Sequence, residues 1–175
     1  MNTLYQRLAG ESISDALLRL EADIKTRPAD ADLRAAFVQF LILSGNWARA
    51  LTQLKSWLAL KPQAKPTVTL LEQAIQGEQQ RARVFAGEAR PAMPEAQWPW
   101  LTTLAQALTE SAGNAQTLRL AALEQAPASR GQVTLENEES HTFEWLMDGD
   151  ARLGPVCETL VNGRYFWVPF CAIDA

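Results

Sequence analysis

Two aspartates and one histidine are the side chains of this sequence best suited to acid–base catalysis. Asp148 and Asp150 lie two residues apart, and His141 precedes Asp148 by seven residues. A pair of carboxylates beside a histidine can supply the general acid and the general base of a hydrolase. Arg152 follows directly, however, and an ion pair with one carboxylate would instead fix a turn. The sequence leaves both interpretations open.

A metal site finds little support in the same region. A calcium-binding EF-hand loop that starts at Asp148 needs an oxygen ligand at its fifth position and glycine at its sixth. The sequence has Arg152 and Leu153 there. Zinc sites need several closely spaced cysteines or histidines, and this sequence has one histidine and two distant cysteines, Cys157 and Cys171. We therefore predict neither a metal nor another cofactor.

Composition limits the class of protein. The sequence has 175 residues, 47% of them hydrophobic and 21% charged, which is ordinary for a soluble globular protein. A net charge of −4 gives no reason to expect nucleic acid or an anionic membrane as partner. No apolar run approaches the roughly 20 residues that cross a bilayer, and the first residues do not resemble a signal peptide. We expect a cytoplasmic protein with reduced cysteines.

The charge is uneven along the chain. Residues 1–90 contain 12 Lys and Arg against 9 Asp and Glu, whereas residues 91–175 contain 4 against 11, which is 4 − 11 = −7. The acidic second half is either a solvated face or a surface that attracts a basic segment of a partner protein.

The first half of the chain contains a helical repeat. Asp15–Pro28 and Arg49–Pro62 align when the second segment is shifted by 34 residues. The shift superposes apolar residues: Ala16 on Ala50, Leu17 on Leu51, Leu20 on Leu54 and Ile24 on Leu58. A period of 34 is typical of the tetratricopeptide repeat, a helix–turn–helix unit that stacks on its neighbours. Each copy follows a glycine, Gly10 or Gly45, that suits a left-handed turn.

Two further helices complete about two repeats. Residues 31–47 have apolar positions along one helical face, with Asp30 or Asp32 as the N-cap, and Thr67–Gly87 gives a fourth helix. A free-standing solenoid usually needs about three repeats. We therefore expect these helices to pack against something else, and the second half of the chain is the obvious candidate.

A helix pair and a hairpin are predicted in the second half. Helices are expected at Trp100–Ser111 and Ala115–Gln125, with Gly113-Asn114 as the turn between them. An exposed acidic loop follows, with a short strand at Gln132–Leu135. Asn162-Gly163 between two β-prone runs is typical of a type I′ hairpin.

The hairpin turn fixes the pairing of its strands. It places Val161 opposite Arg164 and Cys157 opposite Val168, so Cys171 has no cross-strand access to Cys157 and no disulfide is expected. Both faces of the hairpin are largely apolar, which means that helices, more chain or a partner must cover it.

These elements predict a mainly α fold, with tetratricopeptide-like helical repeats followed by a helix pair and a C-terminal β-hairpin. We assign residues 1–90 to the helical region, residues 91–130 to the linker and helix pair, and residues 131–175 to a small β-containing segment. That last segment is expected to pack on the helices in one compact unit.

The stretch "FEWLMDGDARLGPVCETLVNGRYFWVPF" (Phe143–Phe170) resembles the signature block of the ImpE/SciE/TagJ family, accessory proteins of bacterial type VI secretion. The upstream stretches "GNWARALTQLKSWLALKP" and "RARVFAGEARP" resemble the same family in the same order. Members of that family continue past the "WVPF" segment with further β-containing sequence, whereas this sequence ends at Ala175.

The resemblance implies protein binding rather than catalysis. Such proteins associate with a helix near the N-terminus of the small contractile-sheath subunit, TssB, and are linked to ClpV, the AAA+ ATPase that dismantles contracted sheaths. The family has no established catalytic residues to transfer. Helical repeats are also suited to bind an amphipathic helix through apolar anchors.

Three hypotheses follow for the function. The first is an adaptor of the type VI sheath, the second is an unrelated helical-repeat scaffold, and the third is an enzyme that uses Asp148, Asp150 and His141. For the adaptor we predict partner binding by the acidic turn, Asp148 and Asp150, and by the hairpin aromatics Tyr165 and Trp167, taken as exposed. The alternative for Trp167 is a core residue whose loss unfolds the domain. A deep polar pocket that joins His141 to the aspartates would favour the enzyme, and an exposed apolar groove would favour an adaptor.

Overall fold

The computed structural model describes residues 10–173, and the chain divides into two compact units, Met1–Ile75 and Gln76–Ala175. The elements are α2 (Ile13–Thr26), α3 (Ala31–Leu43), α4 (Trp47–Leu60), α5 (Lys65–Phe85), α6 (Trp100–Gln106), α7 (Ala112–Gln125), β1 (Gly131–Thr134), β2 (Ser140–Phe143), β3 (Val156–Val161) and β4 (Arg164–Pro169), with 3-10 turns at Pro62–Ala64 and Phe170–Ala172. The predicted fold class, mainly α with a C-terminal β-hairpin, is confirmed. The three predicted segments, whose outer ends lie outside the described residues, stay a prediction. Within the described range no helix is both long and apolar enough to span a membrane.

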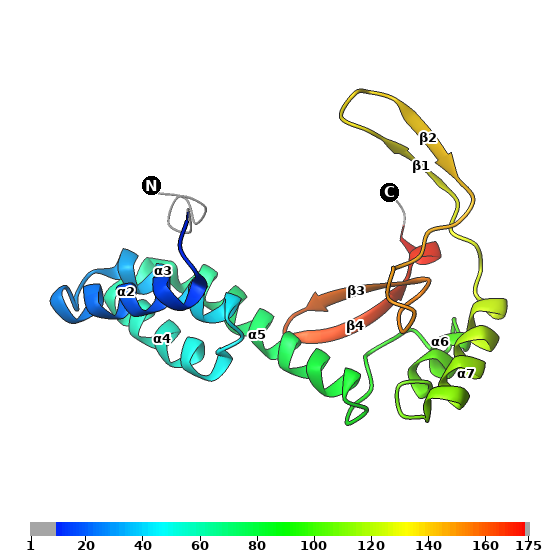
Figure 1. Ribbon diagram of the computed structural model, residues 1–175, viewed down its shortest axis with the longest axis horizontal. Coiled ribbons are helices and arrows are strands. Elements are labelled where there is room, and N and C mark those ends of the chain that lie inside the picture. The colour runs from blue at the N-terminus through cyan, green and yellow to red at the C-terminus, as the bar shows by residue number, and fades with distance from the viewer. Residues whose placement is uncertain (1–9, 174–175) are drawn as a thin grey trace. The chain divides into compact units, whose positions relative to one another are not determined.

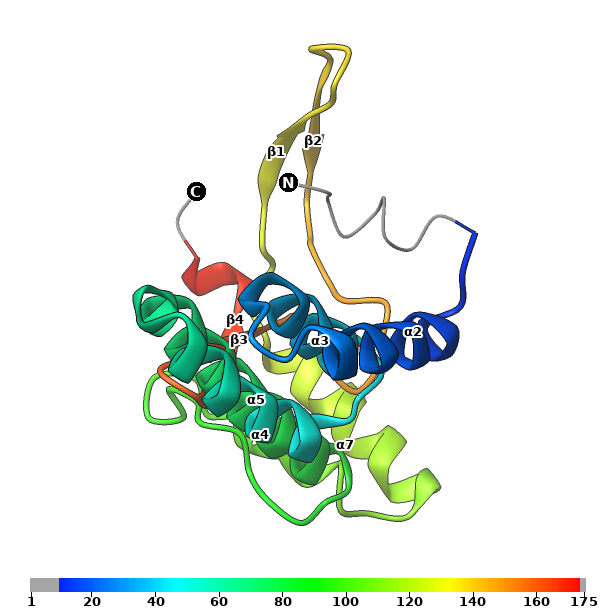
Figure 2. The same ribbon diagram turned by 90° about the vertical axis from the view of Figure 1, so that its left-hand side faces the viewer.

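The first unit is built from helices that follow the predicted repeat. From α2 to α4 the first residue moves from 13 to 47 and the last from 26 to 60, a shift of 34 at both ends. The repeated positions Ala16, Leu20, Ala50 and Leu54 are all fully buried. α3 contacts both α2 and α4, and Figures 1 and 2 show these three helices side by side. The 34-residue alignment therefore marks equivalent core positions.

Local signals begin and end these helices. Asp30 is the N-cap of α3, because its Oδ1 accepts hydrogen bonds from the backbone N–H of Asp32 and of Leu33, both at 3.0 Å. Gly10 and Gly45 have φ of +81° and +72°. A residue with a β-carbon would be strained there, which explains glycine before each copy of the repeat.

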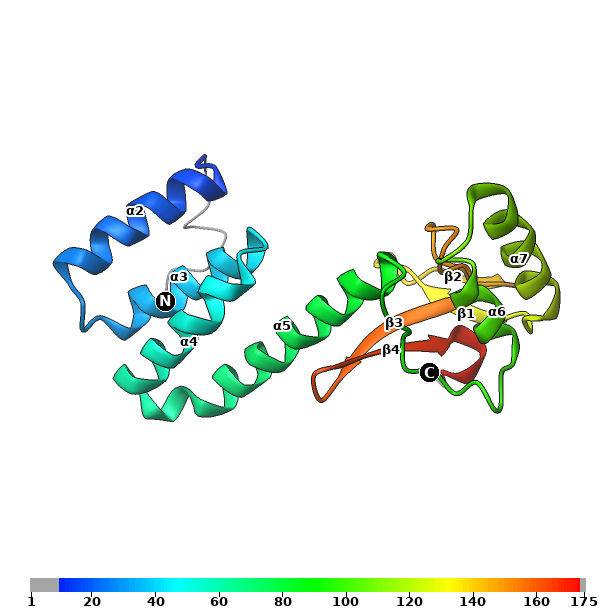
Figure 3. The same ribbon diagram turned by 90° about the horizontal axis from the view of Figure 1, so that it is seen from below.

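The second unit joins the end of α5 to α6, α7 and two hairpins. β3 and β4 pair antiparallel in the predicted register, with Val161 opposite Arg164. Asn162 and Gly163 have φ of +50° and +76°, as a type I′ turn requires. Figure 3 shows this hairpin beside the second half of α5. Ala92 of the connector bonds to the outer edge of β4 through two backbone hydrogen bonds.

The connection between α6 and α7 differs from the prediction. α6 ends at Gln106 rather than at Ser111, and Gly113-Asn114 lies in the first turn of α7 rather than between the helices. The first N–H groups of a helix have no partner within it, so residues of low helix propensity cost little at this end.

The predicted acidic loop is a second hairpin. The strand expected at Gln132–Leu135 is β1, and it pairs with β2, with Gly131 opposite Phe143. Figures 1 and 2 show this hairpin standing away from α6 and α7. β2 has no apolar–polar alternation in its sequence, Ser-His-Thr-Phe, and this is why only one of the two strands was predicted.

Candidate functional site

Tyr165 and Trp167 are buried in the core of the second unit. Their exposed fractions are 1% and 0%, so the expectation that they are exposed is wrong. Residues two apart in a strand face the same side, and the side of β4 that carries both aromatics shares one apolar cluster with Val84 of α5. Trp167 is therefore a core residue, as the alternative interpretation predicted.

A hydrogen-bonded network ties the β3–β4 hairpin to α5. Arg81 of α5 binds both carboxylate oxygens of Glu158, with Nε–Oε1 of 2.7 Å and Nη2–Oε2 of 3.1 Å. The Tyr165 hydroxyl donates to Glu158, and the indole N–H of Trp167 donates to the Tyr165 hydroxyl at 2.8 Å. Burial, and then the hydrogen bond to Glu158, raises the pKa of Tyr165 above its ordinary value. The two aromatic side chains therefore fix the β3–β4 hairpin against α5 from its buried face.

The acidic turn is held by its own hydrogen bonds. Asp150 forms an ion pair with Arg152, with Nη2–Oδ2 of 2.6 Å, as the structural interpretation of this arginine predicted. Hydrogen bonds from the side chain and then the backbone of Arg152 lower the pKa of Asp150 to about 2. Asp148 Oδ1 accepts the backbone N–H of Asp150 at 2.7 Å, and the Asp148 N–H donates to the Gly154 carbonyl at 2.7 Å. Of the two aspartates, only Asp148 has no ion pair in the described residues.

His141 does not join the aspartates in one pocket. It lies on β2 opposite Val133, and its side chain is 59% exposed. The cavity that Asp148 lines does not include His141. In the described part of the chain no three His, Cys, Asp or Glu residues are grouped as metal ligands, and Cys157 and Cys171 are free thiols. The geometry that the enzyme hypothesis requires is not present in this part of the chain.

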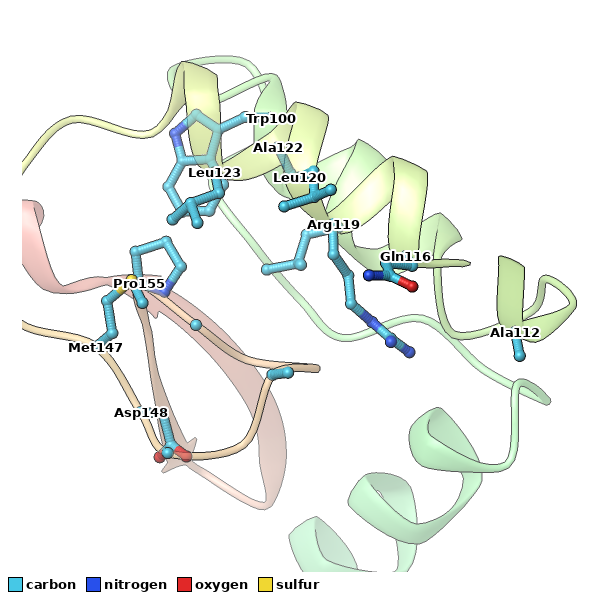
Figure 4. Close-up of a pocket in the computed structure, with 14 residues that line it drawn as sticks. Trp100, Ala112, Gln116, Arg119, Leu120, Ala122, Leu123, Met147, Asp148 and Pro155 are labelled. Atoms are coloured by element: carbon cyan, nitrogen blue, oxygen red, sulfur yellow. The ribbon is translucent and has the colours of Figure 1, made fainter. Parts of the chain in front are cut away.

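An apolar groove lies between α6, α7 and the turn that contains Asp148 (Figure 4). Its volume is about 620 Å³, within the range of ligand-binding clefts. The larger apolar side chains that line it are Trp100, Leu104, Leu120, Leu123, Met147 and Pro155. Its polar side chains are Gln116 and Arg119 of α7 and Asp148 of the turn. We call this cavity the α7 groove.

The α7 groove continues into a patch of exposed apolar side chains. A second cavity of about 220 Å³ shares Leu123 and Met147 with it and adds Trp145 and Leu146. Leu120 is 55% exposed and Trp145 is 64% exposed. An apolar patch rimmed by polar residues is typical of a protein-binding surface. The arrangement is suited to bind an apolar segment rather than to carry out acid–base chemistry.

The sequence predicted the turn beside the groove but not the groove itself. Leu118, Leu120 and Leu123 fall on more than one side of α7, so packing in the unit cannot bury all three. That spread of leucines, together with the apolar run at residues 145–147 next to two aspartates, is the sequence signal from which an exposed apolar groove could have been predicted.

Three comparisons relate the chain to known proteins. The ImpE protein family matches residues 140–175. Over 161 residues the chain is 40% identical to the type VI secretion system accessory component TagJ of Pseudomonas aeruginosa, covering 90% of this chain and 56% of that protein. The crystal structure of protein VPA1032 from Vibrio parahaemolyticus matches with a TM-score of 0.79 and 26% identity, covering 96% of this chain and 63% of that one. The chain thus spans little more than half the length of the curated relative that it matches.

Proposed function

The chain belongs to the ImpE family, and we propose that it is a non-catalytic adaptor of a bacterial type VI secretion system. In this proposal it acts in the cytoplasm and binds a helix of the small contractile-sheath subunit, TssB. It also links that subunit to ClpV, the ATPase that disassembles the sheath. The relative from Pseudomonas aeruginosa supports the secretion-system role through its name, an accessory component.

The exposed apolar α7 groove is the observation that carries the adaptor role. A helix binds in such a groove by burying apolar side chains at positions i, i+3, i+4 and i+7. Leu120 and Leu123, three residues apart on α7, and Met147 on the facing turn offer two apolar walls for these anchors. Each leucine-sized anchor that becomes fully buried contributes about 1.5–3 kcal/mol.

The four residues predicted to bind the partner have separate roles in this proposal. Asp148 lines the groove and has no ion pair within residues 10–173, so it offers a carboxylate to a Lys or Arg of the partner helix. Asp150 fixes the turn through Arg152, and Tyr165 and Trp167 support the hairpin from the core. Only Asp148 is expected to contact the partner directly.

A calorimetric titration with a peptide from the N-terminal helix of the cognate TssB tests the proposal. We expect saturable 1:1 binding that Leu120→Glu weakens at least about 10-fold, because an unpaired charge in an apolar contact is unfavourable. Leu70→Glu is the matched control, since Leu70 is 64% exposed on α5 in the first unit. Circular dichroism should be unchanged in both variants.

Two outcomes would contradict parts of the proposal. Absence of binding by the folded chain at millimolar peptide concentration would show that TssB is not the partner of this chain. Equal weakening of binding by Leu70→Glu and Leu120→Glu would show that the α7 groove is not the binding site.

For the link to ClpV, co-elution of ClpV with the chain in size-exclusion chromatography is the expected result.

A further inference from the structure

We infer that Arg119 makes the α7 groove selective for a helical segment that carries one Asp or Glu between its apolar anchors. The inference rests on the proposed function, since it describes the chemistry of the partner that binds in the same groove.

Arg119, in the groove wall, makes no hydrogen bond or ion pair in the described part of the chain, although its charge acts on Asp150. Its Nε is fully buried and makes no hydrogen bond, and no ion pair of Arg119 is found within residues 10–173. Arg34 has a similarly buried Nε, but its terminal nitrogens donate to Gln53 at 2.7 Å and to the Pro28 carbonyl at 3.3 Å. Arg119, which lines the α7 groove, has no such bonds within residues 10–173.

The nearby carboxylates accept no hydrogen bond from Arg119, and Asp150 interacts with it only through charge. Asp150 is bound by Arg152 through three side-chain hydrogen bonds of 2.6–3.0 Å. Asp148 uses one oxygen to accept a backbone N–H within the turn. Figure 4 shows the Arg119 side chain extending from α7 into the space between that helix and the turn. The guanidinium therefore faces the place where a bound segment would lie.

A carboxylate is the group that best completes this site. A guanidinium presents a fork of N–H donors that matches the two oxygens of a carboxylate. The apolar walls formed by Leu104, Leu120 and Leu123 exclude water, which strengthens such a pair when the groove is filled. A buried donor that lacks an acceptor is unfavourable, so a segment without one loses affinity. The groove thus favours an acidic residue and disfavours a purely apolar helix.

The surroundings restrict the partner further. Residues 76–173 contain 7 Lys and Arg against 12 Asp and Glu, so the positive Arg119 lies within an acidic unit. A uniformly acidic segment would be repelled by this unit, whereas one acidic residue flanked by apolar and basic ones is complementary to it. The exposed patch beyond the groove, at Leu146 and Trp145, extends past the size of a small carboxylic acid. We therefore assign a protein helix rather than a metabolite.

The test uses two designed amphipathic peptides with leucines at i, i+3 and i+7, one with Glu and one with Gln between them. We expect the wild-type chain to bind the Glu peptide roughly 10- to 100-fold more tightly, the effect of a charge-assisted hydrogen-bonded pair. Arg119→Gln should bind both peptides equally. Arg119→Lys should keep a reduced preference, because it retains the charge and loses the fork.

The matched control is Arg130→Gln, since Arg130 is exposed and paired with Glu144 at 3.0 Å outside the groove. It should leave the preference unchanged, and circular dichroism should show every variant folded. Equal affinity of the wild-type chain for both peptides, absence of binding of either, or acetate binding as tight as the peptide would each overturn the inference.

The TssB peptide separates this inference from the proposed function. If that peptide binds and Arg119→Gln does not weaken it, the adaptor proposal stands and the role of Arg119 is wrong. If the TssB peptide fails while the designed peptides show an Arg119-dependent preference for Glu, the groove chemistry stands and the sheath subunit is the wrong partner.

Discussion

Replacing Trp167 by alanine should destabilise the second unit rather than remove a binding contact. Trp167 has no exposed surface, and its indole N–H donates to the Tyr165 hydroxyl at 2.8 Å. The substitution leaves a cavity in the cluster that joins β3 and β4 to α5. The Tyr165 hydroxyl keeps its bond to Glu158, so the main loss is apolar packing.

The size of the stability loss in Trp167→Ala follows from the apolar surface that the tryptophan buries. A tryptophan buries roughly 150–250 Å², which at about 25 cal/mol per Å² corresponds to about 4–6 kcal/mol as an upper bound. Truncations of buried Phe or Trp to alanine typically cost about 3–5 kcal/mol. We expect a loss in this range, which for a unit of this size lowers the melting temperature by about 12 °C or more. Trp167→Phe keeps most of the area and should cost about 1–2 kcal/mol.

Urea unfolding followed by circular dichroism and tryptophan fluorescence measures these losses. Trp145→Ala is the matched control, because Trp145 is 64% exposed, and it should lower the free energy of unfolding by less than about 0.5 kcal/mol. The reasoning is refuted if Trp167→Ala is as stable as Trp145→Ala. Loss of partner binding by a fully stable Trp167→Ala would show instead that Trp167 contacts the partner.

Two further predictions concern the turns. The pKa of Asp150, lowered from 3.8 to about 2 by Arg152, means that this carboxylate stabilises the fold above pH 3.8 and loses that contribution as the pH falls through about 2. Asp150→Asn should lower the free energy of unfolding by no more than about 1 kcal/mol at pH 7, because the ion pair is accessible to solvent. In urea unfolding, the difference in stability between the variant and the wild type should shrink as the pH falls towards 2. A difference that grows instead would contradict the ion pair. Gly163→Ala should cost about 1 kcal/mol, since φ is +76° there. Gly113→Ala is the control and should be neutral or stabilising, because Gly113 lies in the first turn of α7 and no atom of another segment lies within 4 Å of the added carbon. Equal losses of melting temperature in Gly163→Ala and Gly113→Ala would argue against a left-handed conformation at Gly163.

Local signals made several elements predictable. The 34-residue shift located α2 and α4, because identical helix positions must meet identical neighbours in a stacked repeat. Asn162-Gly163 set the register of β3 and β4, since a two-residue turn leaves a single pairing. The ion pair of Arg152 with one of the two aspartates was also predicted, because they are close in the chain, and the structure shows that the partner is Asp150.

The sequence by itself therefore determined the helices of the repeat, the C-terminal hairpin and its turn, and the family to which the chain belongs. Only the tertiary structure decided which faces of these elements are covered. Trp167 is buried because α5, distant in the sequence, packs on its side of β4, whereas Leu120 remains open because nothing in the described chain packs there. Arg152 takes the ion pair with Asp150, and the buried Nε of Arg119 makes no hydrogen bond. Burial and pairing of this kind depend on contacts between distant segments, and periodicity along the chain does not record them.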